Sequence, residues 1–517
     1  MKLNYKRTVL VGFAFFLISA FWQAYDATIP VILTNKFGMS QTWSGFIMAL
    51  DNVLAVFMLP LFGALSDKCA SRYGKRTPFI TIGTILAAVA LIGLSFADNA
   101  QLNNLSKVSA IDDPAALQVL YEAKADTELL TPEGESFVLS ELFTEEEFTA
   151  ITCKVTRSDG STVTNPDYTN YVAPVRQSYA AGVTASNPGA LTLFVVLLLI
   201  VLVSMATFRS PAVALMPDVT MKPLRSKGNA IINLMGTAGG ILVLVLGMVF
   251  STSAVQNAMM RYTVYYGVIA ALMLGSLLIF LLTVREPKWA AEMAADSIRY
   301  GVEEKAEEDS GAKRGLSASE KRSLLLILAS IALWYFGYNA VTSKYAVYAG
   351  NILDKDYNTT MLLAQAAAII AYIPAGNVAS KIGRKKTILG GVVMLAAAFT
   401  VAGFMRVESP TWVMNLMFIL AGIAWATINV NSFPMVVEMC SGADVGKYTG
   451  FYYTASMSAQ IATPMLSGFL MDKLGMTVLF PYAAIFVALA FVTMSLVRHG
   501  DSRVEAKKGL EALDIDD

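Results

Sequence analysis

The chain has 517 residues, of which 55% are hydrophobic and only 15% are charged, with 39 basic and 39 acidic side chains. Soluble domains carry about 25% charged residues, so this composition excludes an ordinary water-soluble protein. The zero net charge gives no reason to expect a nucleic-acid partner. The charges gather in a few connecting segments between long apolar stretches, which is typical of a protein that crosses a membrane several times.

A helix of about twenty apolar residues is long enough to cross a bilayer. We therefore expect an all-α polytopic membrane protein with twelve transmembrane helices in two halves of six. The expected spans of the first half are residues 8–33, 43–66, 78–97, 191–214, 229–250 and 263–284. Those of the second half are residues 322–345, 359–379, 387–405, 412–436, 447–470 and 479–498.

The distribution of Lys and Arg predicts which face is cytoplasmic. Twelve is an even number, so both termini lie on the same side, and the connections on that side are the ones rich in basic residues. Basic loops are retained in the cytoplasm, which places both termini there. The opposite short loops carry only isolated cations such as Lys36, Lys355 and Lys473.

Residues 98–190 interrupt the third and fourth spans and have more acids than bases. A helix-like stretch covers residues 114–125. A hairpin is expected from residues 152–157 and 161–165, around the Asp159-Gly160 turn. We interpret this segment as a small extracytoplasmic insert.

A second long connection, residues 285–321, is rich in Glu, Lys and Ala and is expected to form an interfacial or solvated helix followed by a cytoplasmic linker. It separates the two halves. The expected domains are residues 1–97 (spans 1–3), 98–190 (insert), 191–284 (spans 4–6), 285–321 (linker), 322–498 (spans 7–12) and 499–517 (cytoplasmic tail).

Several kinds of chemistry are not expected. The single histidine, His499, lies near the C-terminus, which argues against a zinc site or a histidine proton relay in the membrane. The cysteines at 69, 153 and 440 are far apart and predict no disulfide framework. The sequence has no Gly-Lys-Ser/Thr phosphate loop. We therefore predict neither an ATP-driven pump nor an enzyme, and no cofactor or metal other than a coupled proton.

A short basic turn, residues 63–79, joins the second and third spans, and a weaker echo, residues 376–386, occupies the same place in the second half. Such an internal repeat indicates two related halves. We expect these turns to act at the cytoplasmic gate, where an acid near a helix end can hold a charge-assisted hydrogen bond across the gate. The alternative is that basic turns reflect topology alone. The expected gate residues are Asp67, Arg72, Gly74, Lys75, Arg76, Gly383 and Arg384.

This organisation resembles the major facilitator superfamily, whose usual turn is Gly-x-x-x-Asp-x-x-Gly-Arg-Lys/Arg. The second turn keeps that spacing from Gly376 to Gly383, with Ser380 in place of the acid. In the first turn four extra residues separate Asp67 from Gly74. That expanded form resembles the sucrose–proton symporter branch of the glycoside–pentoside–hexuronide cation symporters.

A second match to the same branch is the segment from Arg209 to Asp218, followed by Arg225 and Asn229. The resemblance covers all spans and leaves out the insert. It implies a major facilitator fold and sugar transport. Plant sucrose symporters are thought to use an acid on the fourth helix as the proton site, and this sequence has none between Leu191 and Phe208.

Two acids within the spans are therefore our candidates for proton coupling. Asp26 shares one helical face with Trp22 and Gln23, and Asp51, followed by Asn52, lies about two turns into the second span. An ionisable residue inside a membrane usually faces a cavity or a partner. A carboxyl group withdrawn from water holds its proton more readily, as proton exchange near neutral pH requires. The alternative for each acid is a fixed hydrogen-bond anchor between helices.

Arg209 is the main cation of the fourth span. It can pair with a carboxylate or donate to substrate hydroxyls, and Asp218 is its alternative static partner. Sugars present apolar faces and hydroxyl groups, which aromatic side chains and amides can bind. With Arg209, the expected substrate-binding residues are Trp22, Gln23, Asn52, Asn233, Trp334, Tyr338, Asn339, Gln365, Trp425, Asn429, Tyr452 and Gln460. Tyr and Trp also mark membrane interfaces, so packing is the alternative for each.

The sequence thus predicts a monomeric secondary transporter of the plasma membrane (the cell inner membrane in a bacterium). It would move a small glycoside or oligosaccharide together with a proton, by alternating access. One alternative is other cargo or coupling, such as sodium symport or drug export. Met48 and Ala55 do not fit the second-helix pattern of melibiose-type sodium symporters. Another is a membrane sensor that reads a ligand through the insert.

Overall fold

Twelve long helices dominate the computed structural model, which describes residues 3–156, 162–221, 224–299, 317–437, 439 and 445–500. Those of the first half are α1 (Tyr5–Asn35), α2 (Gln41–Asp67), α3 (Thr77–Asn104), α8 (Gly189–Val219), α9 (Arg225–Val249) and α10 (Thr263–Thr283). Those of the second half are α12 (Ala318–Tyr348), α13 (Tyr357–Ile382), α14 (Arg384–Gly403), α15 (Thr411–Val437), α16 (Val445–Leu474) and α17 (Leu479–Ser495).

Ten of these described helices are long and apolar enough to cross a membrane. The other two, α13 and α16, have 26 and 30 residues and pack among the ten. All twelve overlap the expected spans. The largest difference is at α3, which continues to Asn104. Its last two turns stay helical because they carry buried residues, Asp98 and Gln101, that are hydrogen-bonded to other elements.

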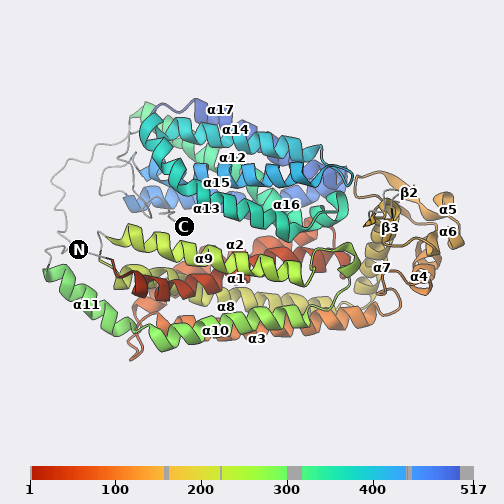
Figure 1. The fold of residues 1–517 in the computed structure, drawn as a ribbon, viewed down its shortest axis with the longest axis horizontal. Helices are drawn as coiled ribbons and strands as arrows, with labels where there is room; N and C mark the ends of the chain where they lie inside the picture. The colour runs from red at the N-terminus through yellow and green to blue at the C-terminus, as the bar shows by residue number, and fades with distance from the viewer. Residues whose placement is uncertain are drawn as a thin grey trace.

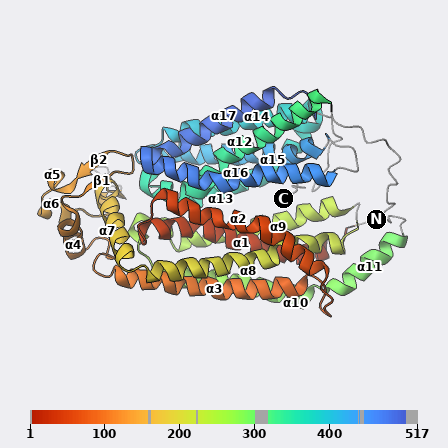
Figure 2. The ribbon, with the colours of Figure 1, turned by 180° about the vertical axis from the view of Figure 1, so that it is seen from behind.

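The helices form two bundles with separate apolar cores. In Figures 1 and 2 the second-half helices lie together above those of the first half. In the first bundle α1 packs on α9 and α3 on α8, and in the second bundle α13 and α14 pack on α15. Small residues permit close approach, since a Cβ atom on Gly239 would overlap the Phe16 carbonyl and one on Gly422 would overlap that of Ala364.

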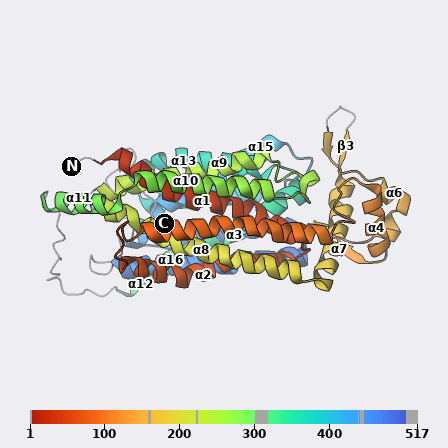
Figure 3. The same ribbon diagram turned by 90° about the horizontal axis from the view of Figure 1, so that it is seen from below.

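The insert folds at one end of the bundles (Figure 3) around its own apolar core. Its elements are α4 (Pro114–Lys124), β1 (Glu128–Leu130), β2 (Ser136–Val138), α5 (Leu139–Leu142), α6 (Glu145–Thr149), β3 (Lys154–Thr156), β4 (Thr162–Thr164), the π-helical turn η1 (Tyr168–Val172) and α7 (Ala173–Ser186). The expected helix is confirmed, and so is the hairpin, because β3 pairs antiparallel with β4. The turn itself, residues 157–161, lies outside the described residues.

The connection between the halves begins with α11 (Glu286–Arg299), as the sequence predicts. Arg7 holds α11 against the start of α1, because its Nη1 lies 2.5 Å from Glu292 Oε2 and its guanidinium lies 5.1 Å from the centroid of the Trp289 ring. Figure 1 shows α11 at the end of the molecule opposite the insert. The rest of the expected linker and the tail beyond residue 500 lie outside the described residues.

Lys36 is not the isolated loop cation that the sequence suggested. Its side chain is completely buried, and its Nζ lies 2.6 and 2.7 Å from the two carboxylate oxygens of Asp98. It also donates to the Met260 carbonyl and lies 4.6 Å from the centroid of the Tyr262 ring. Asp98 was assigned to the acidic insert, but it belongs to this buried ion pair between α1 and α3.

Candidate transport site

The middle of α1 carries three of the candidate residues on one face. Trp22 and Asp26 are partly exposed although most of α1 is buried, so this face borders space that water can reach. Gln23 is only 8% exposed. The Trp22 ring packs edge-on against Phe21 and Tyr25, with centroid distances of 5.2 and 5.4 Å. These aromatic contacts fix the orientation of the indole next to the acid.

Three charged side chains from three helices lie within electrostatic range of one another beside this face. Asp51 of α2 accepts a hydrogen bond of 2.8 Å from Asn52 Nδ2. The charges of Asp26 and Asp51 are close enough to interact, and Arg209 of α8 is the cation that acts on Asp51. The Arg209 guanidinium also lies 5.8 Å from the centroid of the Trp22 ring. An opposite charge compensates for lost hydration, so this grouping explains how ionisable residues are tolerated among apolar helices.

The second half presents an aromatic surface to these charges. Tyr338 of α12 stacks on Trp425 of α15, with ring centroids 3.6 Å apart and planes 3° apart. Tyr335 meets the same indole edge-on at 5.2 Å. Tyr338 is close enough to interact electrostatically with the carboxylate of Asp26. Next to it, the amide nitrogen of Asn339 has no hydrogen-bond partner among the described residues. The aromatic pair thus lies near Asp26 through Tyr338, and Asn339 carries a buried donor at the next position of α12.

An amide bridge crosses the same boundary. Gln365 Nε2 of α13 donates to Gln23 Oε1 at 2.5 Å, and Gln23 Nε2 donates to the Tyr357 hydroxyl at 3.2 Å. Gln23 therefore has partners from the other half on both ends of its amide. We expected it to bind substrate, but in this conformation it joins the two halves.

Not every expected substrate residue reaches this site. Trp334 is 0% exposed and lies in the core of the second bundle, so substrate has no access to it here. Tyr452 is 4% exposed, and its hydroxyl lies 3.3 Å from Ser432 Oγ. Helical spacing alone could not reveal which way these aromatic side chains point. Four of the expected amides are partly exposed on their helices: Asn52, Asn233, Asn429 and Gln460.

The basic turn forms a charge network within the first half. Arg76 donates to Asp67 Oδ1 at 2.5 Å, to Asp218 Oδ2 at 2.7 Å and to Ser66 Oγ at 2.5 Å. One expectation and one alternative are therefore corrected. Among the described residues the ion pair of Asp67 holds α2 to the start of α3 instead of bridging the halves, and Asp218, the alternative partner of Arg209, pairs with Arg76.

Glu286 at the start of α11 completes this network. Its carboxylate accepts from the backbone amides of Lys75, Arg76 and Thr77 at 2.6, 2.9 and 2.9 Å, and so caps the N-terminus of α3. Gly74 has a φ of +113°, and a Cβ atom there would overlap this carboxylate. The glycine is thus required for the linker to dock.

The other expected gate residues described here also lie in the basic turns or at the helix ends that flank them. Arg72 is exposed and donates to the hydroxyl of its neighbour Tyr73 at 2.6 Å. In the second half Gly383 has a φ of +96° and ends α13, and Arg384 begins α14. A glycine tolerates this left-handed conformation at low cost.

The two halves are hydrogen-bonded to each other at the insert end. Asp472 of α16 accepts from the amides of Gln41 and Thr42, both at 2.7 Å, and from the Thr42 hydroxyl at 2.5 Å. Lys344 of α12 is buried and donates to the Gln41 carbonyl at 2.6 Å. Asp472 therefore caps the first turn of α2 from the opposite half. We call this group, Gln41, Thr42, Lys344 and Asp472, the outer gate.

A second contact of the same kind joins α13 to the first half. Asp356 caps α13 and accepts a hydrogen bond from the Ser253 hydroxyl, and Asn358 Nδ2 donates to Thr252 Oγ1 at 3.2 Å. By contrast, the half of α2 nearer α11 exposes large apolar side chains, including Phe57 at 71%. Sequence reasoning missed these contacts because a polar residue at the end of a span looks like an ordinary loop residue.

Two facing six-helix bundles, with charges at their boundary, define a polytopic membrane protein. A family model described as Major Facilitator Superfamily matches residues 353–513, and one described as MFS/sugar transport protein matches residues 10–105. These matches lie in opposite halves. Each half of the chain is therefore similar to a family model of major facilitator proteins.

Solved structures share the fold. The xylose transporter XylE from E. coli in an inward-open conformation has a TM-score of 0.58 at 15% identity, covering 99% of both chains. A D-xylose-proton symporter has a TM-score of 0.56 at 15% identity, covering 96% of this chain and 99% of that chain. A peptide transporter, POT, reaches 0.58 at 11% identity over 95% of this chain and 93% of its own. At these identities the likeness concerns the fold alone.

Relatives in sequence match over short segments. Sucrose transport protein SUC3 of Arabidopsis thaliana is 37% identical over 59 residues, which is 11% of this chain and 10% of that protein. Human proton-associated sugar transporter A is 39% identical over 66 residues, 13% and 8% of the two chains. The MFS-type transporter ppzB of Metarhizium rileyi is 25% identical over 142 residues, 27% and 29%. The chain spans less than a third of the length of each of these relatives.

Proposed function

We propose that the protein is a secondary active transporter that moves a small glycoside or oligosaccharide together with a proton. The observation that carries this proposal is a chain of electrostatic interactions that joins Asp26, Asp51 and Arg209 of the first half to Tyr338 of the second, which stacks on Trp425. A sugar ring has an apolar face that suits the aromatic pair and hydroxyl groups that suit charged and amide side chains. The sugar-transport family model over residues 10–105 supports this cargo class.

Arg209 offers a physical route for coupling. When Asp51 is ionised, its charge holds the guanidinium, and fewer of the N–H groups of Arg209 are available to a ligand. When Asp51 takes up a proton, that attraction is lost and the N–H fork can donate to substrate hydroxyls. Proton binding and sugar binding would then favour each other, as symport requires. Asp26 lies close enough to share the titration with Asp51.

We further propose that the insert end faces outward and that both termini lie in the cytoplasm of a cell whose plasma membrane holds the protein as a monomer. The basic turn around Arg76 supports this orientation, because basic loops stay on the cytoplasmic side. The outer gate is then closed in this structure, and the partly exposed α1 face would be reached from the cytoplasm. Rocking of the two bundles would expose the same site to the outside.

Uptake into proteoliposomes tests the proposal. A panel of mono-, di- and trisaccharides is offered with an inward proton gradient, with an inward sodium gradient and with neither. We expect one sugar class to accumulate only with the proton gradient. Sodium-driven accumulation would overturn the coupling, and failure of every sugar to accumulate would overturn the cargo class.

Replacing the acids tests which residues couple. Asp26→Asn or Asp51→Asn should abolish accumulation against a gradient, and exchange of labelled for unlabelled sugar should continue, because exchange needs no net proton movement. The matched control is Glu145→Gln, which removes an exposed carboxylate from the insert and should leave both activities unchanged. Full proton-driven accumulation in both Asp variants would exclude these residues as proton sites.

A further inference from the structure

The insert is attached firmly to the first half. The Arg176 side chain of α7 is 2% exposed and donates to the carbonyls of Val108, Ala110 and Ile111, which closes the insert on itself just beyond α3. Gln177 Nε2 donates to Asn35 Oδ1 at the end of α1 at 3.0 Å. The insert also continues directly into α3 and α8, so it must move together with the first bundle.

The same insert touches the second half at the tip of its first hairpin. The turn between β1 and β2 lies on the connection between α16 and α17, where the Met476 amide donates to the Pro132 carbonyl at 2.7 Å. A Cβ atom on Gly475 would overlap the Glu133 carbonyl, so the two backbones are in direct contact. Arg406 Nε donates to Glu133 Oε1 at 3.0 Å. That ion pair is about half exposed and adds little by itself, whereas the backbone contact requires an aligned geometry.

A second contact joins the other hairpin to the second half. The Thr164 hydroxyl of β4 donates to Asp354 Oδ1 at 2.5 Å, and the Thr164 amide donates to Oδ2 at 3.3 Å. Asp354 follows the π-helical turn η4 (Ala349–Leu353) at the end of α12 and has a φ of +48°. Because the Asp354 carboxylate accepts two hydrogen bonds from one residue of the insert, this contact forms only in one relative orientation of the two segments.

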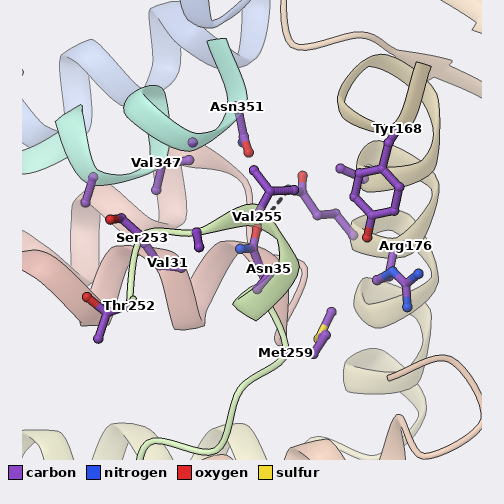
Figure 4. A pocket seen from close by; sticks show the side chains of 16 residues that line it. Val31, Asn35, Tyr168, Arg176, Thr252, Ser253, Val255, Met259, Val347 and Asn351 are labelled. Carbon is purple, nitrogen blue, oxygen red and sulfur yellow. Dashed lines mark hydrogen bonds between the residues drawn. The ribbon is translucent and has the colours of Figure 1, made fainter. Parts of the chain in front are cut away.

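Between these contacts the insert does not pack tightly on the bundles. Figure 4 shows a cavity where Arg176 and Tyr168 of the insert face Asn35 of the first half and Val347 and Asn351 of the second. A second cavity of about 250 Å³ separates the first hairpin from the outer gate. Apart from the approach of η1 to η4, the described part of the insert therefore meets the second half at two small polar contacts, and its apolar core is separate from that of the second bundle. Such contacts can separate without exposing a large apolar surface.

We propose that the insert is an external clasp of the transport cycle. It is carried by the first half, it holds the second half at Asp354 and at Gly475–Met476 while the outer gate is closed, and it must release both contacts before the site opens outward. The inference rests on the proposed transport function for its role in the cycle. Its geometry rests only on contacts between the insert and the second half.

A reversible cross-link tests the clasp. Thr164→Cys and Asp354→Cys are introduced together, and Cys69 and Cys440 are replaced by Ser. Cys153 can remain, because its side chain is 0% exposed and its thiol is unreactive. Burial is the main cause that raises the pKa of this thiol to about 11, and the charge of nearby Asp112 is the second. We expect oxidation to lower uptake by at least about tenfold, because a locked gate blocks turnover, and reductant to restore it. The reduced protein shows whether the variant folds.

The matched control cross-links the insert to the half that carries it. Gln177→Cys with Asn35→Cys replaces a hydrogen-bonded pair of 3.0 Å that does not cross the boundary between the halves. Its oxidation should leave uptake unchanged. Undiminished uptake by the oxidised Thr164–Asp354 pair would overturn the proposal, and so would equal inhibition by the control pair.

A second measurement needs no transported substrate, so it separates failure of the clasp from failure of the proposed function. Ser44 of α2 is 0% exposed beside the outer gate, and Ser44→Cys serves as a reporter for a membrane-impermeant maleimide. Asp354→Gly should raise labelling from outside by roughly fivefold or more, because it removes the acceptor of both Thr164 hydrogen bonds, tolerates the positive φ at this position and so shifts the population toward the open gate. Unchanged labelling would overturn the clasp whatever the protein transports.

Discussion

The buried ion pair of Lys36 and Asp98 provides a sharp prediction about stability. Both side chains are 0% exposed, and Lys36 Nζ has three acceptors within 2.7 Å, the two Asp98 oxygens and the Met260 carbonyl. Asp98→Asn removes the negative charge and can keep at most one of the two short hydrogen bonds. The remaining partners are the Met260 carbonyl and the Tyr262 ring, which do not neutralise an ammonium group. Breaking a buried pair in this way costs about 3–5 kcal/mol.

The measurement is denaturation of the purified protein in detergent, followed by tryptophan fluorescence. The control is the double variant Lys36→Met with Asp98→Leu, which removes both charges and keeps apolar volume. Replacing a whole buried pair is often neutral, so this variant should recover most of the loss, with a coupling free energy of about 2 kcal/mol or more. The reasoning would be refuted if Asp98→Asn lost less than about 1 kcal/mol, or if the double variant were less stable than either single one.

Three further predictions concern the site and its gates. Trp425→Ala should raise the KM for sugar severalfold, since it removes the indole on which Tyr338 stacks, whereas the buried Trp334→Phe should leave KM unchanged; equal effects would contradict the assignment. Asp67→Ala should lower kcat more than it raises KM, because its ion pair lies in the turn and not at the site; the reverse pattern would count against a gating role. Burial by itself raises the pKa of Asp356, but hydrogen bonds from Ser253 and from the first turn of α13 hold it below its ordinary value. The ionised Asp356 therefore stabilises the fold at a pH above its unfolded pKa, and this stabilisation is lost as the pH falls through the lower folded pKa. In Asp356→Ala, the free energy of unfolding should consequently fall less steeply with decreasing pH in the acid range.

The sequence was sufficient for the helices and for their grouping. Long apolar runs can satisfy their backbone groups inside a bilayer only as helices, so the expected spans and the twelve helices agree closely. The β3–β4 hairpin was also predictable, because its turn residues specify a local conformation. Spacing in the sequence could not predict that Asp26 lies near Asp51, since the two are on different helices. Both were nevertheless candidates for the same site, because a charged residue inside a membrane is energetically unfavourable without a function or a partner.

Tertiary structure decided which side chains face each other. Trp334 and Trp425 look alike in sequence, yet one lies in the core and the other stacks at the boundary, because the rotation of a helix about its axis is set by its neighbours. Lys36 and Asp98 are 62 positions apart, and the sequence places them in a short loop and in the insert, whereas the fold pairs them. The outer gate and the clasp depend in the same way on contacts between the ends of distant helices, where polar residues are ordinary in sequence. The sequence alone determined a two-bundle membrane protein with buried acids, and packing between the bundles determined which of its polar residues form ion pairs, lie at the boundary or form hydrogen bonds across it.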